Sequence, residues 1–150
     1  PVENVANLAA KMTEMGCFQI SLGDTIGAGT PVQAKMMVQK VSEKVPVSKL
    51  ALHFHDTRGQ ALANIYACLE LGVSVIDASV AGLGGCPYAK GATGNVATED
   101  VVFMLNGMNI ETGIDLNKLI DTGRFISSFL GRLPQSRVSA SASNDHLHLN

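Results

Sequence analysis

The fold is decided by the stretch Lys49-Leu-Ala-Leu-His-Phe-His55, in which two kinds of side chain alternate. Successive residues of a β-strand point to opposite faces of a sheet. One face of this strand therefore carries the large apolar side chains of residues 50, 52 and 54, and the other carries Ala51, His53 and His55. The apolar face predicts a layer of covering helices, and the small and polar face predicts an enclosed interior.

Outward from this strand, short strand patterns alternate with longer helix patterns. We expect further strands at residues 18–22 and 73–80, with helices at about 5–16, 30–41, 62–72 and 95–106 and a last helix capped by Asp115. Such alternation predicts parallel strands with right-handed crossovers. A (β/α)₈ barrel is favoured over an open doubly wound sheet, because the candidate chemical groups follow the C-terminal ends of three strands.

The predicted fold class is α/β, a partial TIM (β/α)₈ barrel made of the last three strand–helix units and a C-terminal helix. Three units cannot close a barrel of about eight strands, so exposed parallel edges are expected. The chain begins with Pro1 and a helix that no strand precedes, so we expect a piece of a longer protein. Residues 1–132 are assigned to the barrel domain, and residues 133–150 are predicted to be an extended or disordered tail.

Composition excludes several classes of partner. Hydrophobic residues make up 46% and charged residues 16% of the chain, a proportion typical of soluble globular domains. A net charge of −2 provides no field that favours nucleic acid, and no apolar run is long enough to span a bilayer. The cysteines Cys17, Cys68 and Cys86 are odd in number and far apart, which favours a reducing compartment over a disulfide framework.

His53 and His55 form an H-x-H pair at a strand end, and strand periodicity aims both imidazoles to the same side. They are candidate ligands of one metal ion; the alternative is a pair of histidines that form ordinary hydrogen bonds. Asp56 follows directly and is a candidate for orienting a ligand. Asn95 has two interpretations, a helix cap or a donor of an amide oxygen to a hard cation.

The two loops around this strand carry the other candidate groups. Asp24 lies in Gly23-Asp-Thr-Ile-Gly27 and is either a general acid/base or an Asx-turn residue. Cys86 lies in a Gly-rich stretch, residues 82–94, where a thiol can be exposed and reactive. That stretch is a mobile lid or an ordinary connector. Glu99 and Asp100 are expected on a solvated helix face; the alternative is that either one orients a metal ligand.

Ser79-Val-Ala-Gly-Leu-Gly-Gly-Cys-Pro-Tyr88 resembles the signature of the 3-hydroxy-3-methylglutaryl-CoA (HMG-CoA) lyases. The segments Ile20-Ser-Leu-Gly-Asp-Thr-Ile-Gly27, His53-Phe-His-Asp56 and Gly94-Asn-Val-Ala-Thr-Glu-Asp100 resemble the same family, in the same order. The resemblance extends to about Arg132.

The resemblance implies a (β/α)₈ barrel that binds Mg²⁺ or Mn²⁺. It implies cleavage of HMG-CoA, an acyl-CoA, to acetoacetate and acetyl-CoA, as in leucine degradation and ketone-body metabolism. It also implies a homodimer that binds neither nucleic acid nor membrane. The expected location is the cytoplasm of a bacterium or the mitochondrial matrix of a eukaryote, although no targeting signal is visible.

The resemblance assigns roles to single residues as well. His53, His55 and Asn95 match metal ligands, and His53 and Asp24 match residues that assist acid/base chemistry. Cys86 matches the lid cysteine implicated in proton transfer, and the neighbouring glycines form the lid that binds substrate: Gly82, Gly84 and Gly85.

One departure limits what this chain is expected to do alone. The family carries an Arg-Asp pair that supplies a cation and a metal-binding carboxylate, and no Arg-Asp dipeptide occurs here. A neutral His/His/Asn set should hold a hard dication weakly, so we expect little or no turnover by these residues alone. The alternatives are a condensing enzyme of the isopropylmalate or homocitrate synthase type and a non-catalytic fragment that only assembles.

Overall fold

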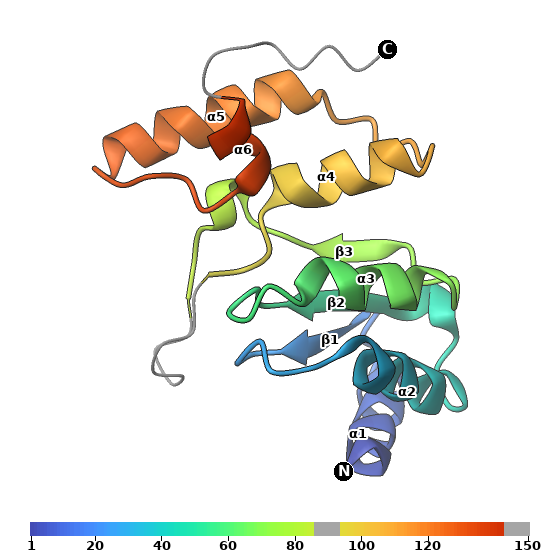
Figure 1. Ribbon diagram of the computed structural model, residues 1–150. Helices are drawn as coiled ribbons and strands as arrows, with labels where there is room; N and C mark the ends of the chain where they lie inside the picture. The colour runs from blue at the N-terminus through green and yellow to red at the C-terminus, as the bar shows by residue number, and fades with distance from the viewer. Residues whose placement is uncertain (86–93, 143–150) are drawn as a thin grey trace. The chain divides into compact units, whose positions relative to one another are not determined.

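The structure, a computed structural model, describes residues 1–85 and 94–142. Its elements are α1 (Val2–Glu14), β1 (Ile20–Asp24), α2 (Pro31–Ser42), η1 (Val47–Lys49), β2 (Leu50–Phe54), α3 (Ala61–Leu69), β3 (Val75–Asp77), η2 (Val80–Gly82), α4 (Thr98–Gly107), α5 (Leu116–Phe129) and α6 (Arg137–Ser141) (Figure 1). The described residues form two compact units, one of residues 1–77 and one of residues 78–85 with 94–142. Among them, no helix has the length and apolarity that crossing a membrane requires.

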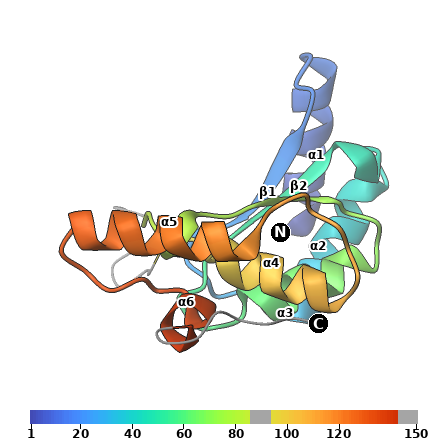
Figure 2. The same cartoon turned by 90° about the horizontal axis from the view of Figure 1, so that it is seen from above.

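The first unit is built on a three-stranded parallel sheet in the order β1-β2-β3. Helices α2 and α3 pack against each other and α1 packs against α2 (Figure 2). The parallel pairing that the alternation of strands and helices predicted is confirmed. Leu50, Leu52 and Phe54 are buried, as the two-faced pattern of this strand requires.

The start of α2 follows from its sequence. Thr30 lies at the N-cap with an extended backbone, and Pro31 occupies the first turn, where its fixed φ is favourable. The side-chain oxygen of Gln33 accepts hydrogen bonds from the Thr30 N–H at 3.0 Å and from the Thr30 hydroxyl at 3.1 Å. Thr30 and Gln33 together form a capping box.

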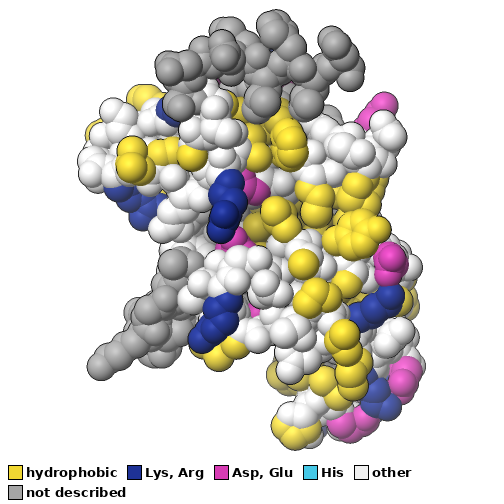
Figure 3. Space-filling model, viewed as in Figure 1, with side chains coloured by type: hydrophobic (Ala, Val, Ile, Leu, Met, Phe, Trp, Pro, Cys, Tyr) yellow, Lys and Arg dark blue, Asp and Glu magenta, His cyan; other side chains and the backbone are white. Residues whose placement is uncertain are grey.

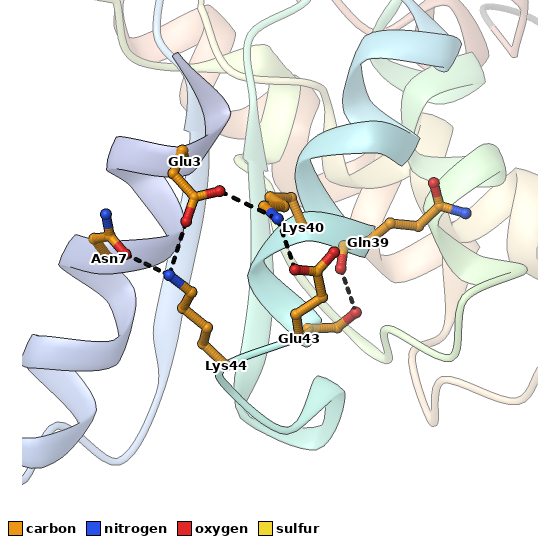
Figure 4. Close-up of polar contacts among 7 residues, drawn as sticks. Glu3, Asn7, Gln39, Lys40, Glu43 and Lys44 are labelled. Carbon is orange, nitrogen blue, oxygen red and sulfur yellow. Dashed lines mark hydrogen bonds and ion pairs between the residues drawn. The ribbon is translucent and has the colours of Figure 1, made fainter.

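An ion network joins α1 to α2 on the surface of the first unit (Figure 4). Lys44 donates to Glu3 Oε1 at 2.8 Å and also to Asn7. The ammonium of Lys40 lies 3.1 Å from Glu3 Oε2 and 2.7 Å from Glu43 Oε2. The two lysines hold the pKa of the Glu3 carboxyl below its usual value. Because these groups are largely exposed, the network contributes little to stability.

The sheet has two open edges, at β3 and at β1, because each of these strands pairs only with β2 among the described residues. A cavity of about 140 Å³ lies between β1 and α1, and another of about 220 Å³ lies between β1 and α2. On α1, four apolar side chains are partly exposed: Val2, Val5, Leu8 and Met12. Figure 3 shows hydrophobic side chains interspersed with charged ones on the molecular face that it draws. On β1 itself Ile20 and Leu22 are buried, so these exposed apolar side chains belong to α1.

Strand and helix ends differ from the sequence expectation. β1 runs to Asp24 because Asp24 pairs with Phe54, and β3 is limited to the three residues that pair with β2. In the second unit, Ser79 forms a parallel bridge with Ala97, and α4 therefore begins at Thr98. These ends are set by pairing partners, which a local sequence pattern does not contain.

The second unit packs α4, α5 and α6 together with η2. Its apolar core contains Val102, Leu116, Ile120 and Ala142, with Leu119 and Val138 packed against them. The predicted cap of the last long helix is confirmed, because Asp115 Oδ1 accepts from the backbone N–H of Asn117 at 3.0 Å and of Lys118 at 3.1 Å.

The prediction of an extended tail differs from the structure at Arg137–Ser141, which form α6. Ser136 caps this helix by accepting from the Ser139 N–H at 3.0 Å, and it donates to Asp100 Oδ1 at 2.6 Å. Asp100 also accepts from the Val138 N–H at 3.0 Å. A buried carboxylate thus organises the start of the helix. The tail residues 143–150 lie outside the described residues.

The prediction of a solvated face for Glu99 and Asp100 was wrong, since both side chains are buried. The Ala81 N–H donates to both carboxylate oxygens of Glu99, at 2.9 and 3.0 Å, and Ser139 Oγ donates at 3.4 Å. Gly123 in α5 provides the space, because a Cβ there would collide with Glu99 Oε1. Burial raises the pKa of Glu99 above its usual value.

We expect the substitution Glu99→Gln to flatten the pH dependence of stability. Because the folded-state pKa of Glu99 is raised, its protonated form stabilises the fold below the unfolded-state pKa, and this contribution is lost as pH rises through the folded-state pKa. The natural chain should therefore lose unfolding free energy over that range, and the variant should lose less. Urea denaturation between about pH 4 and pH 8 measures both slopes. The exposed Glu111→Gln is the control; equal slopes for the natural chain and Glu99→Gln would contradict the assignment.

Candidate functional site

Polar side chains gather at the C-terminal edge of the parallel sheet in the first unit. β1 ends at Asp24, β3 ends at Asp77, and His55 follows β2 directly. The register places His53 between Gly23 and Asp77 on the neighbouring strands. In parallel sheets this edge is where ligands and active sites are found.

The two imidazoles lie side by side, with ring centroids 5.6 Å apart and planes inclined at 49°. The His53 side chain is 42% exposed, whereas His55 is buried. The Nδ1 atom of His55 is buried and has no hydrogen-bond partner among the described residues. A buried ring nitrogen without a partner is costly unless a donor or a cation meets it. The pair therefore fits a metal ion.

The described residues do not supply an anionic cluster for such an ion. Within residues 1–85 and 94–142, no three His, Cys, Asp or Glu side chains are grouped so that they could hold a metal. Two neutral imidazoles without a carboxylate suit a borderline transition metal better than Mg²⁺. Weak binding of hard cations by these residues alone stays a prediction.

Sequence reasoning missed Asp77 and Ser21. The carboxylate of Asp77 lies 3.6 Å from His53 Nδ1 and accepts a hydrogen bond from Ser21 Oγ at 2.6 Å. Ser21 is on β1 and Asp77 on β3, so this bond passes over β2, where Ala51 is small enough to leave room. The available signal was strand periodicity, which puts Asp77 and Val75 on the same face as His53 and Ala51. Asp77 is placed to orient the His53 ring.

The structure gives Asp24 a role in its own loop. Its two carboxylate oxygens accept from the backbone N–H groups of Ala28 at 3.1 Å and of Gly29 at 2.8 Å. This is the turn-stabilising alternative that the sequence left open. Asp56, the candidate for orienting a histidine, instead accepts from the Ala61 N–H at 2.9 Å at the start of α3.

The loop after β1 packs tightly against the end of β2. Gly27 has a φ of +57°, and a Cβ at this position would lie 2.8 Å from the His55 carbonyl oxygen and 2.8 Å from Thr57 Oγ1. Arg58 Nη1 donates to the carbonyl oxygens of Ile26 at 2.9 Å and Gly27 at 3.1 Å. These contacts hold the backbone of His55 in place.

Asn95 belongs to the second unit. Its interpretation as a helix cap is excluded, because α4 begins at Thr98 with Ala97 at the N-cap. Asn95 Nδ2 donates to the Leu83 carbonyl oxygen at 3.0 Å. Asn95 Oδ1 is buried and has no hydrogen-bond partner among the described residues. The amide oxygen is therefore free to meet a cation.

The structure describes only part of the Gly-rich stretch, residues 82–94, that was a candidate lid. Gly82 and Gly84 have φ values of +65° and +95°, and Ala81 before them has +56°. Cys86, the predicted proton donor, lies outside the described residues, as does the rest of 86–93. Cys68 is a packing residue, since it is buried and burial raises the pKa of its thiol to about 11.

Comparison with known proteins identifies relatives of this chain. The family model described as HMGL-like matches residues 1–126. The mitochondrial hydroxymethylglutaryl-CoA lyase of Gallus gallus is 62% identical over 138 residues, which are 92% of this chain and 46% of the relative.

Solved structures give the same result. Hydroxymethylglutaryl-CoA lyase from Pseudomonas aeruginosa matches with a TM-score of 0.91 and 53% identity, covering 94% of this chain and 47% of that chain. An HMG-CoA lyase from Acinetobacter baumannii in complex with coenzyme A and 3-methylmalate matches with a TM-score of 0.88 and 40% identity, covering 97% and 48%. The chain spans about half the length of the relatives it matches.

We expect these 150 residues alone to bind Ni²⁺ more tightly than Mg²⁺, because paired imidazoles favour late transition metals. The dissociation constant for Mg²⁺ should be on the order of 1 mM or weaker, as for hard-cation sites of low charge. Isothermal titration calorimetry measures both.

The tail also contains an H-x-H pair, so His146→Ala and His148→Ala are introduced first as a background. In that background His55→Ala should abolish Ni²⁺ binding, with circular dichroism checking that the chain stays folded. Binding of Mg²⁺ as tight as that of Ni²⁺, or Ni²⁺ binding that survives His55→Ala, would refute the histidine site.

Proposed function

Because the chain belongs to the HMGL-like family, we propose that the protein containing it is an HMG-CoA lyase, which cleaves 3-hydroxy-3-methylglutaryl-CoA to acetoacetate and acetyl-CoA. The observation that carries the proposal is the His53–His55 pair at the C-terminal edge of the sheet, with a buried ring nitrogen that has no partner within residues 1–85 and 94–142. It lies in a segment that matches relatives named as lyases of this substrate.

We propose that the three-stranded sheet is part of a (β/α)₈ barrel and supplies its last three strands. The parallel order β1-β2-β3 and the open edge at β1 support this placement. The lyase from Pseudomonas aeruginosa, about twice as long, superposes with a TM-score of 0.91. An acyl-CoA substrate is supported by the Acinetobacter baumannii lyase, which was solved with coenzyme A.

The residues proposed to hold Mg²⁺ or Mn²⁺ are His53, His55 and Asn95, the last through its amide oxygen. A bound dication supplies Lewis-acid polarisation of the hydroxyl and carbonyl oxygens of the substrate. Asp77, held by Ser21, keeps the His53 ring oriented. The homodimer and the compartment expected from the resemblance stay predictions.

The proposed chemistry needs one base and one acid. A base, for which His53 and Asp24 are the candidates, removes the proton of the C3 hydroxyl. The bond between C2 and C3 then breaks, its electron pair stays on the acetyl-CoA carbon, and the Cys86 thiol protonates that carbon. Asp24 already binds two backbone N–H groups, so its part in proton transfer is the weaker of the two.

The test is a Mg²⁺- or Mn²⁺-dependent cleavage assay on the protein with its upstream coding sequence restored, following acetoacetate from HMG-CoA. We expect Cys86→Ala to lower kcat by about 100-fold or more, the usual contribution of a positioned acid or base. His53→Ala should be at least as damaging. Cys17→Ala is the matched control, because this free thiol is remote from the proposed chemistry in the sequence and is expected to leave kcat unchanged.

Absence of acetoacetate with a folded, metal-loaded protein would reject this substrate. Acetyl-CoA-dependent condensation with a 2-oxo acid would then identify the condensing-enzyme alternative. Asp24→Asn adds a separate readout. If Asp24 only stabilises its turn, the amide of asparagine can accept only one of the two N–H bonds, so Asp24→Asn should lower the melting temperature with little loss of kcat.

A further inference from the structure

We propose that Gly84 and the carbonyl of Leu83 position the side chain of Asn95. Together they orient its amide so that the oxygen, and not the nitrogen, is available to bind a cation. This inference rests on the proposed metal-dependent function. Gly84 would then act through Asn95. The resemblance had assigned it instead to the lid that binds substrate.

The orientation of the amide follows from the chemistry of its one hydrogen bond. An asparagine side chain has a donating NH₂ end and an accepting oxygen end of nearly equal size, and rotation by half a turn exchanges them. The carbonyl oxygen of Leu83 can only accept, so the atom that faces it at 3.0 Å must be Nδ2. Oδ1 is therefore turned the other way.

The oxygen end of the Asn95 amide has no hydrogen-bond partner in the part of the chain that the structure describes. Asn95 Oδ1 is buried and accepts no hydrogen bond from any described residue. An amide oxygen is a ligand of the kind that hard dications prefer. A buried acceptor that faces no donor is unfavourable by itself, and coordination of a cation removes that cost.

Gly84 makes the hydrogen bond sterically feasible. A Cβ built on Gly84 would lie 2.7 Å from Asn95 Nδ2, closer than a real Cβ atom approaches another heavy atom. Gly84 also has a φ of +95°, which side-chain-bearing residues rarely adopt. An alanine at this position would push the amide away from Leu83 and release its orientation.

The same geometry explains an amide in place of a carboxylate. By charge alone, aspartate would be the stronger ligand for a dication. Aspartate, however, has no hydrogen to donate to the Leu83 carbonyl, so two oxygens would face each other at hydrogen-bonding distance. Only an amide can donate at one end and coordinate at the other.

The experiment measures Mn²⁺ affinity by electron paramagnetic resonance in the protein with its upstream sequence restored, without substrate. Gly84→Ala should weaken Mn²⁺ binding about tenfold or more, as loss of a group that orients a ligand commonly does. Gly16→Ala is the matched control, because Gly16 has a similar φ of +99° and nothing within 4 Å of a built Cβ. It carries the same backbone strain and should leave Mn²⁺ affinity unchanged.

A double-mutant cycle separates positioning from general damage. Asn95→Ala should weaken Mn²⁺ binding, and Gly84→Ala should add no further loss in that background. Asn95→Asp should bind Mn²⁺ more weakly than the natural protein. Thermal melting curves check that each variant is folded.

Three results would overturn the inference: tighter Mn²⁺ binding by Asn95→Asp, full affinity in folded Gly84→Ala, or the same loss from Gly84→Ala whether or not Asn95 is present. Unchanged affinity in Asn95→Ala would remove Asn95 as a ligand and the inference with it. Because no substrate is present, failure of the proposed cleavage reaction would leave these outcomes unaffected.

Discussion

The arrangement of the candidate site depends on the register of β2 between its two parallel neighbours. That register places His53 between Gly23 and Asp77, with glycine leaving space on one side and a carboxylate on the other. A slip of one residue would turn the histidines toward the helix layer and the phenylalanine toward the polar face. The burial of Leu50, Leu52 and Phe54 opposes such a slip, so the packing of the apolar face fixes the positions of the chemical groups.

Features with local causes were predictable from the sequence. The parallel sheet follows from the alternation of strand and helix patterns, the start of α2 follows from Thr30 and Gln33, and the start of α5 follows from Asp115. The H-x-H pair was found because two histidines at period two share one side of a strand. For the two helix starts and the H-x-H pair, the residues that determine the feature lie within a few positions of one another.

Features with distant causes were not predictable in this way. Ser21 and Asp77 are 56 residues apart, and only the strand order brings them together. Burial of Glu99 and Asp100 depends on Gly123 in α5 and on Ser136 before α6, neither of which a pattern within α4 contains. The tail was predicted to be extended or disordered. It is ordered around Ser136 because the buried carboxylate of Asp100 accepts its hydrogen bonds.

The proposed site requires that His53 on β2 and His55 directly after it ligate a metal ion. Pulsed electron paramagnetic resonance of the Mn²⁺-loaded protein, with its upstream sequence restored, tests this most directly. Directly bound imidazole nitrogen should give couplings that change when histidine alone is labelled with ¹⁵N, and that weaken when His55 is replaced by alanine. A spectrum without nitrogen coupling, or one that histidine labelling leaves unchanged, would contradict it.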